Sequence, residues 1–283
     1  MAKTSSILNG KLIAEKMLAV MAKKIDLLKK TGAIISLATV RVGDAKDTML
    51  YFETIERLLK KVGVEHVPSV SPKNISEADL CKKILALNRE PTITGIMIFS
   101  PLPAALDASV ILSAVDQFKD VEGRTFMKSH FGVFSPTANA VMALIRESGI
   151  EIAGKEAVVI GHSDLVGKPA AILLLDELAT VTVCHAKTVN LKQKIQAADI
   201  VVAAAGKPNL VKGEWIKPGA IVIDVGENFL NGKLVGDVEF DEAKKRAGMI
   251  SPVPGGVGPL TNVMLIQNLL KIHSLRDLRN GNR

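Results

Sequence analysis

The chain has 283 residues, of which 48% are hydrophobic and only 4% aromatic, and its formal net charge is +7. The length suits two domains or one large α/β domain, and the aliphatic composition favours helices on a parallel sheet over an aromatic-filled barrel. The basic residues form no dense run, which argues against a nucleic-acid-binding protein and suits a small anionic ligand. The only two cysteines, Cys81 and Cys184, lack metal-ligand spacing, and no segment has the length and apolarity of a membrane span or signal peptide. We therefore expect a reduced, cytoplasmic protein without a metal site and without membrane contact.

The first half of the chain alternates helical and extended patterns. Helices are expected over residues 11–30, from Asp47 or Thr48 to Lys61, from Ser76 onward and over residues 108–115, and strands over residues 33–41, 66–70 and 95–100. This alternation predicts a parallel sheet with crossover helices. A helix that begins at Thr137 or Asn139 and ends near Gly149 is expected to join this lobe to the next.

The second half contains short β-rich runs separated by helices or turns. Strands are expected over residues 156–161, 180–184, 200–204 and 220–224, and helices over residues 170–178 and 191–197. This order is typical of a doubly wound nucleotide-binding domain. We predict an α/β protein of two lobes, one formed by residues 1–140 with 262–283 and the other by residues 141–261.

Prolines and glycines crowd the stretch from Ser251 to Thr261. Proline fixes φ and glycine permits positive φ, so this stretch is a stiff, sharply turning loop against which a flat ligand can lie. A tight connection between two elements, without a ligand, is the alternative.

A second glycine-containing motif runs from Gly161 through Ser163 and Gly167 to Pro169, between a predicted strand and a predicted helix. Backbone N–H groups and the helix N-terminus can hold a phosphate at such a turn, and the polar residues His162 and His185 are candidates for contact with a ribose phosphate. The spacing departs from the usual dinucleotide motif, so an ordinary strand–helix turn is the alternative.

Two features of the first lobe are candidates for ligand contact. Tyr51 is the only tyrosine, and it either stacks on a ligand or packs in the core. Asp120 and Glu122 flank a turn, where a carboxylate can accept hydrogen bonds from a heterocycle, or where both are solvated charges.

Taken together, these motifs resemble the bifunctional 5,10-methylenetetrahydrofolate dehydrogenase/5,10-methenyltetrahydrofolate cyclohydrolase family (FolD type), over nearly the whole chain. The segments that carry the resemblance are residues 252–259 with Thr261, 161–169, 212–219, 224–226, 236–238 and 101–103. The resemblance implies a folate-binding first lobe completed by the C-terminal helix, a Rossmann-type second lobe, a homodimer, a tetrahydrofolate derivative as substrate and NADP or NAD as cofactor.

The resemblance also implies roles for individual residues. Tyr51 is the catalytic and substrate-binding tyrosine, and the other substrate contacts are Glu122, Pro254, Gly255 and Gly256. The implied cofactor contacts are Thr137, Gly161, His162, Ser163, Ala186, Glu227 and Thr261.

Several positions depart from the family pattern. Ile55 stands where the family has a catalytic lysine, Phe99 replaces its supporting glutamine, and Glu122 replaces a pterin-binding aspartate. On the cofactor side, His162 replaces an arginine, Ala186 a serine and Glu227 an isoleucine.

Isoleucine and phenylalanine cannot transfer a proton, so we expect cyclohydrolase activity to be lost or very weak. Hydride transfer depends mainly on how the protein positions the substrate and the cofactor. We therefore expect dehydrogenase activity to persist, with a weakened preference for NADP. The rival reading is a folate-binding homologue that performs different one-carbon chemistry without a nicotinamide cofactor, or a non-catalytic binding protein.

Overall fold

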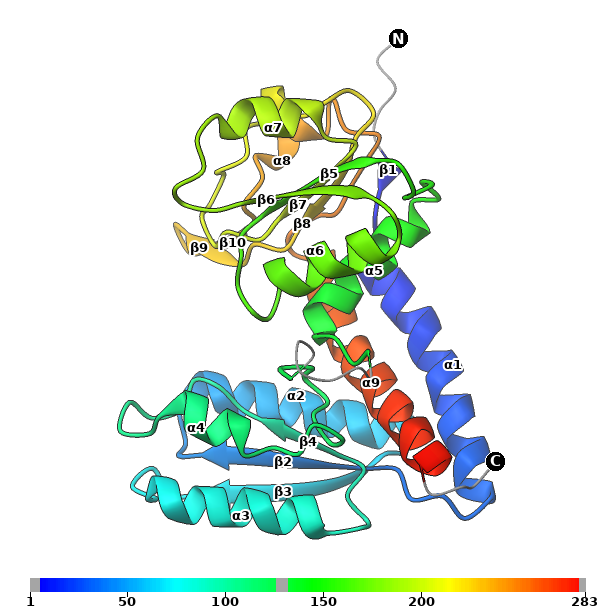
Figure 1. Ribbon diagram of the computed structural model, residues 1–283, viewed down its shortest axis with the longest axis vertical. Helices are drawn as coiled ribbons and strands as arrows, with labels where there is room; N and C mark the ends of the chain where they lie inside the picture. Colours follow the sequence, from blue (N-terminus) through cyan, green and yellow to red (C-terminus); the bar gives the residue numbers. More distant parts are fainter. Residues whose placement is uncertain (1–5, 126–131, 280–283) are drawn as a thin grey trace. The chain divides into compact units, whose positions relative to one another are not determined.

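The structure, a computed structural model, describes residues 6–125 and 132–279 (Figure 1). Most contacts fall within two compact units. The six-stranded unit contains residues 6–15 and 135–264, and the three-stranded unit contains residues 16–125, 132–134 and 265–279. The first helix, α1 (Gly10–Lys30), and the last, α9 (Val257–Arg279), each supply residues to both units. The expected α/β class is confirmed.

The six-stranded unit is built on a parallel sheet in the order β1-β11-β8-β7-β5-β6. Its strands are β1 (Ser6–Ile7), β5 (Glu156–Ile160), β6 (Thr180–Cys184), β7 (Ile200–Ala203), β8 (Ile221–Asp224) and β11 (Met249–Ile250). The central strands β7 and β8 are buried along their whole length, which explains their continuous aliphatic sequences.

Helices cover both faces of this sheet, α5 and α6 on one and α7 and α8 on the other (Figure 1). The unit's helical elements are α5 (Pro136–Glu147), α6 (Gly167–Asp176), α7 (Leu191–Ala197), α8 (Phe240–Ala243) and the 3₁₀ turn η1 (Gly213–Trp215). A hairpin of β9 (Asn228–Leu230) and β10 (Lys233–Val235) lies outside the main sheet. The predicted start of α5 at Thr137 or Asn139 was wrong: the helix begins at Pro136, and the hydroxyl of its N-cap Ser135 accepts the Ala138 N–H at 3.1 Å.

The three-stranded unit has a parallel sheet in the order β3-β2-β4. Its elements are β2 (Ser36–Val42), α2 (Lys46–Val62), β3 (Glu65–Ser71), α3 (Glu77–Arg89), β4 (Gly95–Ile98) and α4 (Ala108–Ser113). Alternate residues of β2 point to opposite faces of the sheet, and Ala38, Val40 and Val42 form one core with α3 and α4.

Two predicted helix starts in this unit had different outcomes. Ser76 is the N-cap of α3 and accepts the Asp79 N–H at 3.1 Å, as the sequence predicted. Helix α2 begins at Lys46 after an N-cap alanine that makes no side-chain cap bond, so a start at Asp47 or Thr48 was wrong.

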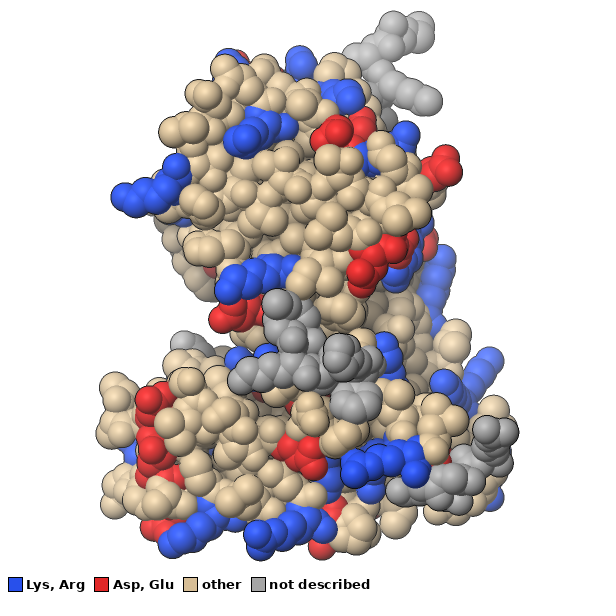
Figure 2. All heavy atoms as spheres, viewed as in Figure 1, with Lys and Arg blue, Asp and Glu red and all other residues tan. Residues whose placement is uncertain are grey.

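Figure 2 shows Lys and Arg side chains interspersed with Asp and Glu side chains over the face in view, without a continuous basic area. Within residues 6–125 and 132–279, no helix combines the length and apolarity that a bilayer crossing requires.

Candidate functional site

The turn between β5 and α6 requires glycine at two positions. A Cβ on Gly161, whose φ is +122°, would lie 2.1 Å from the Ala204 carbonyl oxygen. A Cβ on Gly167 would lie 2.1 Å from the Gly161 carbonyl oxygen. The glycines therefore let the turn fold tightly between the ends of β5 and β7 and the first residue of α6.

A pocket of about 570 Å³ opens beside this turn, at the carboxyl ends of β5, β6 and β7. Four predicted cofactor residues line it: Gly161, His162, Ser163 and Ala186. Its size lies within the usual range for a small-molecule site, about 300–1,000 Å³. The carboxyl ends of parallel strands are also the usual place for a nucleotide in an open α/β sheet. The turn between β5 and α6 thus combines backbone without side chains and an adjacent cavity. A strand–helix turn that binds no ligand does not require this combination.

The polar side chains of this pocket are mostly basic. The ring centroids of His162 and His185 are 5.5 Å apart, and the ring planes are tilted by 59°. Lys168 pairs with Asp164 at 2.5 Å, and Lys207 also lines the pocket. This wall chemistry suits an anionic ligand.

The other three predicted cofactor residues do not line this pocket. Thr137 lies in the first turn of α5, two residues after Ser135, whose hydroxyl donates to the Leu165 carbonyl of the β5–α6 turn. Thr261 is in α9 and its hydroxyl donates to the Val257 carbonyl at 3.4 Å. Glu227 lies near the first turn of α9, where a Cβ on Gly258 would be 3.0 Å from its Oε1.

Two buried carboxylates that the sequence analysis did not single out hold the loops around the pocket. Asp237 accepts the backbone N–H groups of Ala205 at 2.6 Å, Gly206 at 2.9 Å and Lys207 at 2.8 Å, and so fixes the loop after β7. Asp224 accepts the N–H groups of Gly226, Asp237 and Val238. Burial is the largest influence on Asp224 and raises its pKa to about 6.

Glycines in the segments 224–226 and 236–238 lie against these carboxylates. A Cβ on Gly236 would lie 1.9 Å from Asp224 Oδ2, and one on Gly226 would lie 2.3 Å from Asp237 Oδ1. Gly236 therefore leaves room for the Asp224 carboxylate, and Gly226 leaves room for the Asp237 carboxylate.

The start of α1 holds the loop of Pro254, Gly255 and Gly256. The Lys11 N–H donates to the Gly255 carbonyl at 3.3 Å, and a Cβ on Gly10 would lie 1.7 Å from the Gly256 carbonyl oxygen. Gly255 has a φ of +108°, while Pro254 is exposed. The loop is thus a fixed backbone surface with an accessible proline.

In the three-stranded unit, Tyr51 projects from α2 with 37% of its surface exposed, so it is not a core residue. Its ring meets the buried ring of Phe99 edge-on at 5.4 Å, and Phe99 also contacts Phe52 at 5.5 Å. Ile55, one turn after Tyr51, is completely buried. Phe99, which is in contact with Phe52, thus forms an apolar layer against Tyr51.

Glu122 lies next to this layer, because its Oε2 accepts the Ile98 N–H at 3.3 Å. Arg124 donates to both carboxylate oxygens, from Nη2 at 3.0 Å and from Nε at 3.3 Å. Burial raises the pKa of Glu122 although Arg124 opposes the shift. Asp120 is also buried and accepts the Glu122 and Thr125 N–H groups, so the reading of two solvated charges was wrong.

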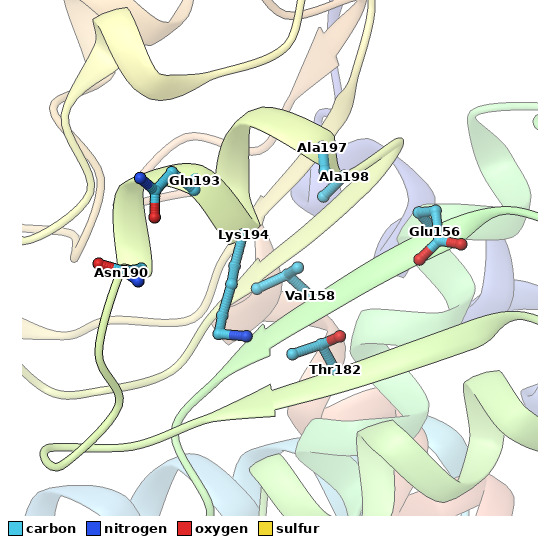
Figure 3. Close-up of a pocket in the computed structure, with 8 residues that line it drawn as sticks. All are labelled: Glu156, Val158, Thr182, Asn190, Gln193, Lys194, Ala197 and Ala198. Carbon is cyan, nitrogen blue, oxygen red and sulfur yellow. The ribbon is translucent and has the colours of Figure 1, made fainter.

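A smaller pocket of about 370 Å³ lies between α7 and the strands β5 and β6 (Figure 3). Lys194 extends from α7 over Val158 and Thr182, and Ala197 and Ala198 close the apolar side. It has no glycine turn, so it is a weaker candidate for a nucleotide than the pocket beside Gly161. Among the described residues, no cluster of three His, Cys, Asp or Glu side chains could hold a metal ion.

Two family models match the chain. Residues 8–122 match the catalytic domain, and residues 135–277 the NAD(P)-binding domain, of tetrahydrofolate dehydrogenase/cyclohydrolase. A bifunctional protein FolD 2 of Geobacter metallireducens is 44% identical over 99% of this chain and 100% of its own length.

Solved structures agree with these matches. The bifunctional FolD enzyme of Campylobacter jejuni has a TM-score of 0.92 and 36% identity, over 96% of this chain and 99% of its own. The FolD enzyme of Trypanosoma brucei, solved with NADP and an inhibitor, has a TM-score of 0.88 and 37% identity, over 97% of this chain and 99% of its own.

Proposed function

Because the chain belongs to the tetrahydrofolate dehydrogenase/cyclohydrolase family, we propose that it oxidises 5,10-methylenetetrahydrofolate with NADP or NAD and does not efficiently hydrolyse the methenyl product. The observation that carries this proposal is that two buried hydrocarbon side chains stand near Tyr51: Phe99, which contacts its ring, and Ile55, one turn along α2. The family resemblance assigns a proton-transferring lysine and its supporting glutamine to these two positions.

The six-stranded unit supports the cofactor side of the proposal. A glycine turn that no larger residue can replace, a basic pocket of about 570 Å³ and the loop held by Asp237 fit a dinucleotide phosphate. When bound, a nicotinamide cofactor supplies the hydride acceptor, and the protein has to bind and orient it. The residues that would hold it here are Gly161, His162, Ser163 and Ala186, with Thr137, Glu227 and Thr261 as predicted contacts outside this pocket.

The three-stranded unit supports the folate side. Glu122 is a partly buried acceptor for the amine and amide groups of a pterin, and Tyr51 offers an exposed ring for stacking. Pro254, Gly255 and Gly256 are proposed as the backbone surface against which the substrate lies. None of these groups needs to move a proton for hydride transfer, because binding in the correct orientation is the main requirement.

An absorbance assay tests both parts of the proposal. Purified protein is given methylenetetrahydrofolate with NADP or NAD, and methenyltetrahydrofolate formation and decay are followed. We expect formation to depend on protein and decay to match the rate in buffer. Decay at a rate comparable to formation would contradict the loss of cyclohydrolase activity. No formation with either cofactor would favour the rival folate-binding function.

We also propose a cytoplasmic homodimer. Both cysteines are free, and β6 is an edge strand of the six-stranded sheet. Exposed apolar side chains lie on or near this edge, with Val183 39%, Leu175 52% and Leu178 74% exposed. Light scattering after gel filtration would give twice the chain mass for a dimer, and the single chain mass would contradict it.

A further inference from the structure

The Arg124 side chain keeps donors that its ion pair with Glu122 does not use. A guanidinium has five N–H groups in a fixed plane, and two of them donate here, from Nε at 3.3 Å and from Nη2 at 3.0 Å. In the described part of the chain, no other residue accepts from the remaining three. One N–H of Nη1 and one of Nη2 are parallel, so they form a second donor face. The side chain is 20% exposed, so this face can meet a ligand.

The Glu122 carboxylate has one acceptor position left, on the oxygen beside that donor face. An ionised carboxylate offers about four acceptor positions, two on each oxygen. Oε2 already accepts the Ile98 N–H at 3.3 Å and the Arg124 Nε–H at 3.3 Å. Oε1 accepts only from Arg124 Nη2, which lies 3.0 Å away. The pair therefore presents an acceptor, Oε1, and donors, Nη1 and Nη2, next to one another.

The backbone around the pair is fixed by buried polar side chains. Asp120 accepts the Glu122 N–H at 3.1 Å and the Thr125 N–H at 2.9 Å, and Asn268 donates to the Val121 carbonyl at 2.8 Å. Both Asp120 and Asn268 are buried. A ligand that binds the pair therefore does not have to order the turn first, which favours selective binding.

The pair also lies close to the aromatic ring offered for stacking. Ile98, which donates to Glu122, directly precedes Phe99, and the ring of Phe99 meets the ring of Tyr51 at 5.4 Å. One flat heterocycle can thus contact the exposed Tyr51 ring and present its edge to Glu122 and Arg124. The pair has no net charge, so a neutral ring carbonyl suits its donor face better than a free carboxylate does.

We propose that Glu122 and Arg124 together bind the lactam edge of the pterin, with Glu122 Oε1 accepting the N3–H and Arg124 donating to the C4 carbonyl oxygen. This proposal rests on the proposed function, because it takes a tetrahydrofolate derivative as the ligand. A carboxylate without a partner would accept two neighbouring donors, the N3–H and the 2-amino group, through both oxygens. Arg124 occupies that two-oxygen face here. The C4 carbonyl, rather than the 2-amino group, is therefore the feature that selects the ligand.

Calorimetric titration of the whole protein with three ligands tests which edge is bound. The ligands are tetrahydrofolate, its 4-amino-4-deoxy analogue, which lacks the carbonyl and the N3–H, and its 2-desamino-2-methyl analogue, which lacks only the 2-amino group. We expect the 4-amino analogue to bind about 10–100-fold more weakly than tetrahydrofolate, and the 2-methyl analogue to bind within about threefold of it.

Arg124→Lys separates the shape of the guanidinium from its charge. Lysine keeps a cation beside Glu122 but has no planar second donor face. We expect the preference for tetrahydrofolate over the 4-amino analogue to fall about tenfold in this variant. Arg276→Lys is the control, because it makes the same change at an arginine that donates to the carbonyls of Ile93 and Pro91. It should keep the full preference.

Two results would overturn the proposal and leave the dehydrogenase function intact. One is a tenfold or greater loss of affinity with the 2-methyl analogue, because the carboxylate would then bind the edge that carries the 2-amino group. The other is an unchanged preference in a folded Arg124→Lys variant, with folding checked by circular dichroism. The three-ligand comparison uses the unchanged protein, so it does not depend on the variant. Absence of tetrahydrofolate binding by the unchanged protein would instead overturn the proposed function itself.

Discussion

The ring of Phe99 meets the ring of Tyr51 edge-on, with 5.4 Å between centroids and 76° between planes. Such a contact stabilises by roughly 0.5–1.5 kcal/mol beyond area burial, so Phe99 holds the tyrosine in place but offers it no proton. Ile55, fully buried one turn along α2, adds a second hydrocarbon surface. The arrangement suits a ring that orients a substrate.

The proposed loss of cyclohydrolase activity predicts that proton-carrying side chains at positions 55 and 99 raise hydrolysis. We expect Ile55→Lys combined with Phe99→Gln to raise methenyltetrahydrofolate hydrolysis by at least about tenfold, since a placed acid–base group typically supplies ~10²–10⁴-fold. The same change should lower the free energy of unfolding by about 2–4 kcal/mol, because it places polar groups where an apolar core was. The control Ile55→Met should leave hydrolysis unchanged. Equal hydrolysis by the double variant and the unchanged protein would count against this role for the two positions.

Folate binding should weaken as the pH falls, because an ionised Glu122 is the better acceptor for pterin N–H groups. Burial raises the pKa of Glu122 and Arg124 opposes the shift, so Arg124→Gln should move this loss of affinity to higher pH. Fluorescence titration with tetrahydrofolate from pH 5 to pH 8 would measure it. Glu122→Gln is the control and should bind more weakly with little dependence on pH. An unshifted profile in the arginine variant would argue against this coupling.

Asp224 should make the six-stranded unit less stable as the pH rises from about 4 to about 6. Its pKa is about 6 in the folded chain, whereas the ordinary value for an aspartate is 3.8, so the folded state binds the proton more tightly than the unfolded state. The resulting stabilisation is complete below pH 3.8 and is lost as the pH passes 6. A shift of about two units corresponds to about 3 kcal/mol.

Urea unfolding of the unchanged protein and of Asp224→Asn isolates this contribution. We expect the stability difference between them to change by a few kcal/mol across this pH range, in the direction given above. Asp199→Asn is a control of opposite sign, because a hydrogen bond from Lys217 lowers the pKa of Asp199. Its stabilising effect is present above pH 3.8 and is lost as the pH falls. If the free energies of unfolding of the Asp224 variant and of the unchanged protein changed with pH in parallel, Asp224 would not be the source of this pH dependence.

The sequence predicted much of the framework because short aliphatic runs bounded by turns, such as β7 and β8, are typical of buried strands. It also located the glycine turn at Gly161, but it left open whether Tyr51 packs in the core, and the structure shows that its ring is partly exposed. It did not reveal β1, which has two residues and owes its place to pairing with β11. The start of α5 was also misassigned, because Ser135 caps the helix ahead of a proline at its first position.

The site residues that the sequence did not reveal were missed for one physical reason. Asp237 acts through backbone N–H groups about thirty positions earlier in the chain, and no spacing rule connects such partners. Arg124 was visible as a charge in a turn, but only the fold shows that it pairs with the partly buried Glu122. Sequence patterns report local structure well, whereas these contacts depend on which loops the sheet brings together.

Adding one methyl group at Gly10 should disturb the loop of Gly255 and Gly256. The new Cβ would lie 1.7 Å from the Gly256 carbonyl oxygen, so the backbone of α1 or of the loop has to move. We expect Gly10→Ala to cost about 1–3 kcal/mol in the free energy of unfolding, as overpacking does, and to raise the Kd for tetrahydrofolate severalfold.

Gly32→Ala is the control: its φ of +87° makes the change strained, but no atom lies within 4 Å of the added Cβ. It should therefore destabilise by about 1 kcal/mol and leave folate affinity unchanged. If both variants lowered stability alike and neither changed folate affinity, the packing of α1 against this loop would have no part in substrate binding.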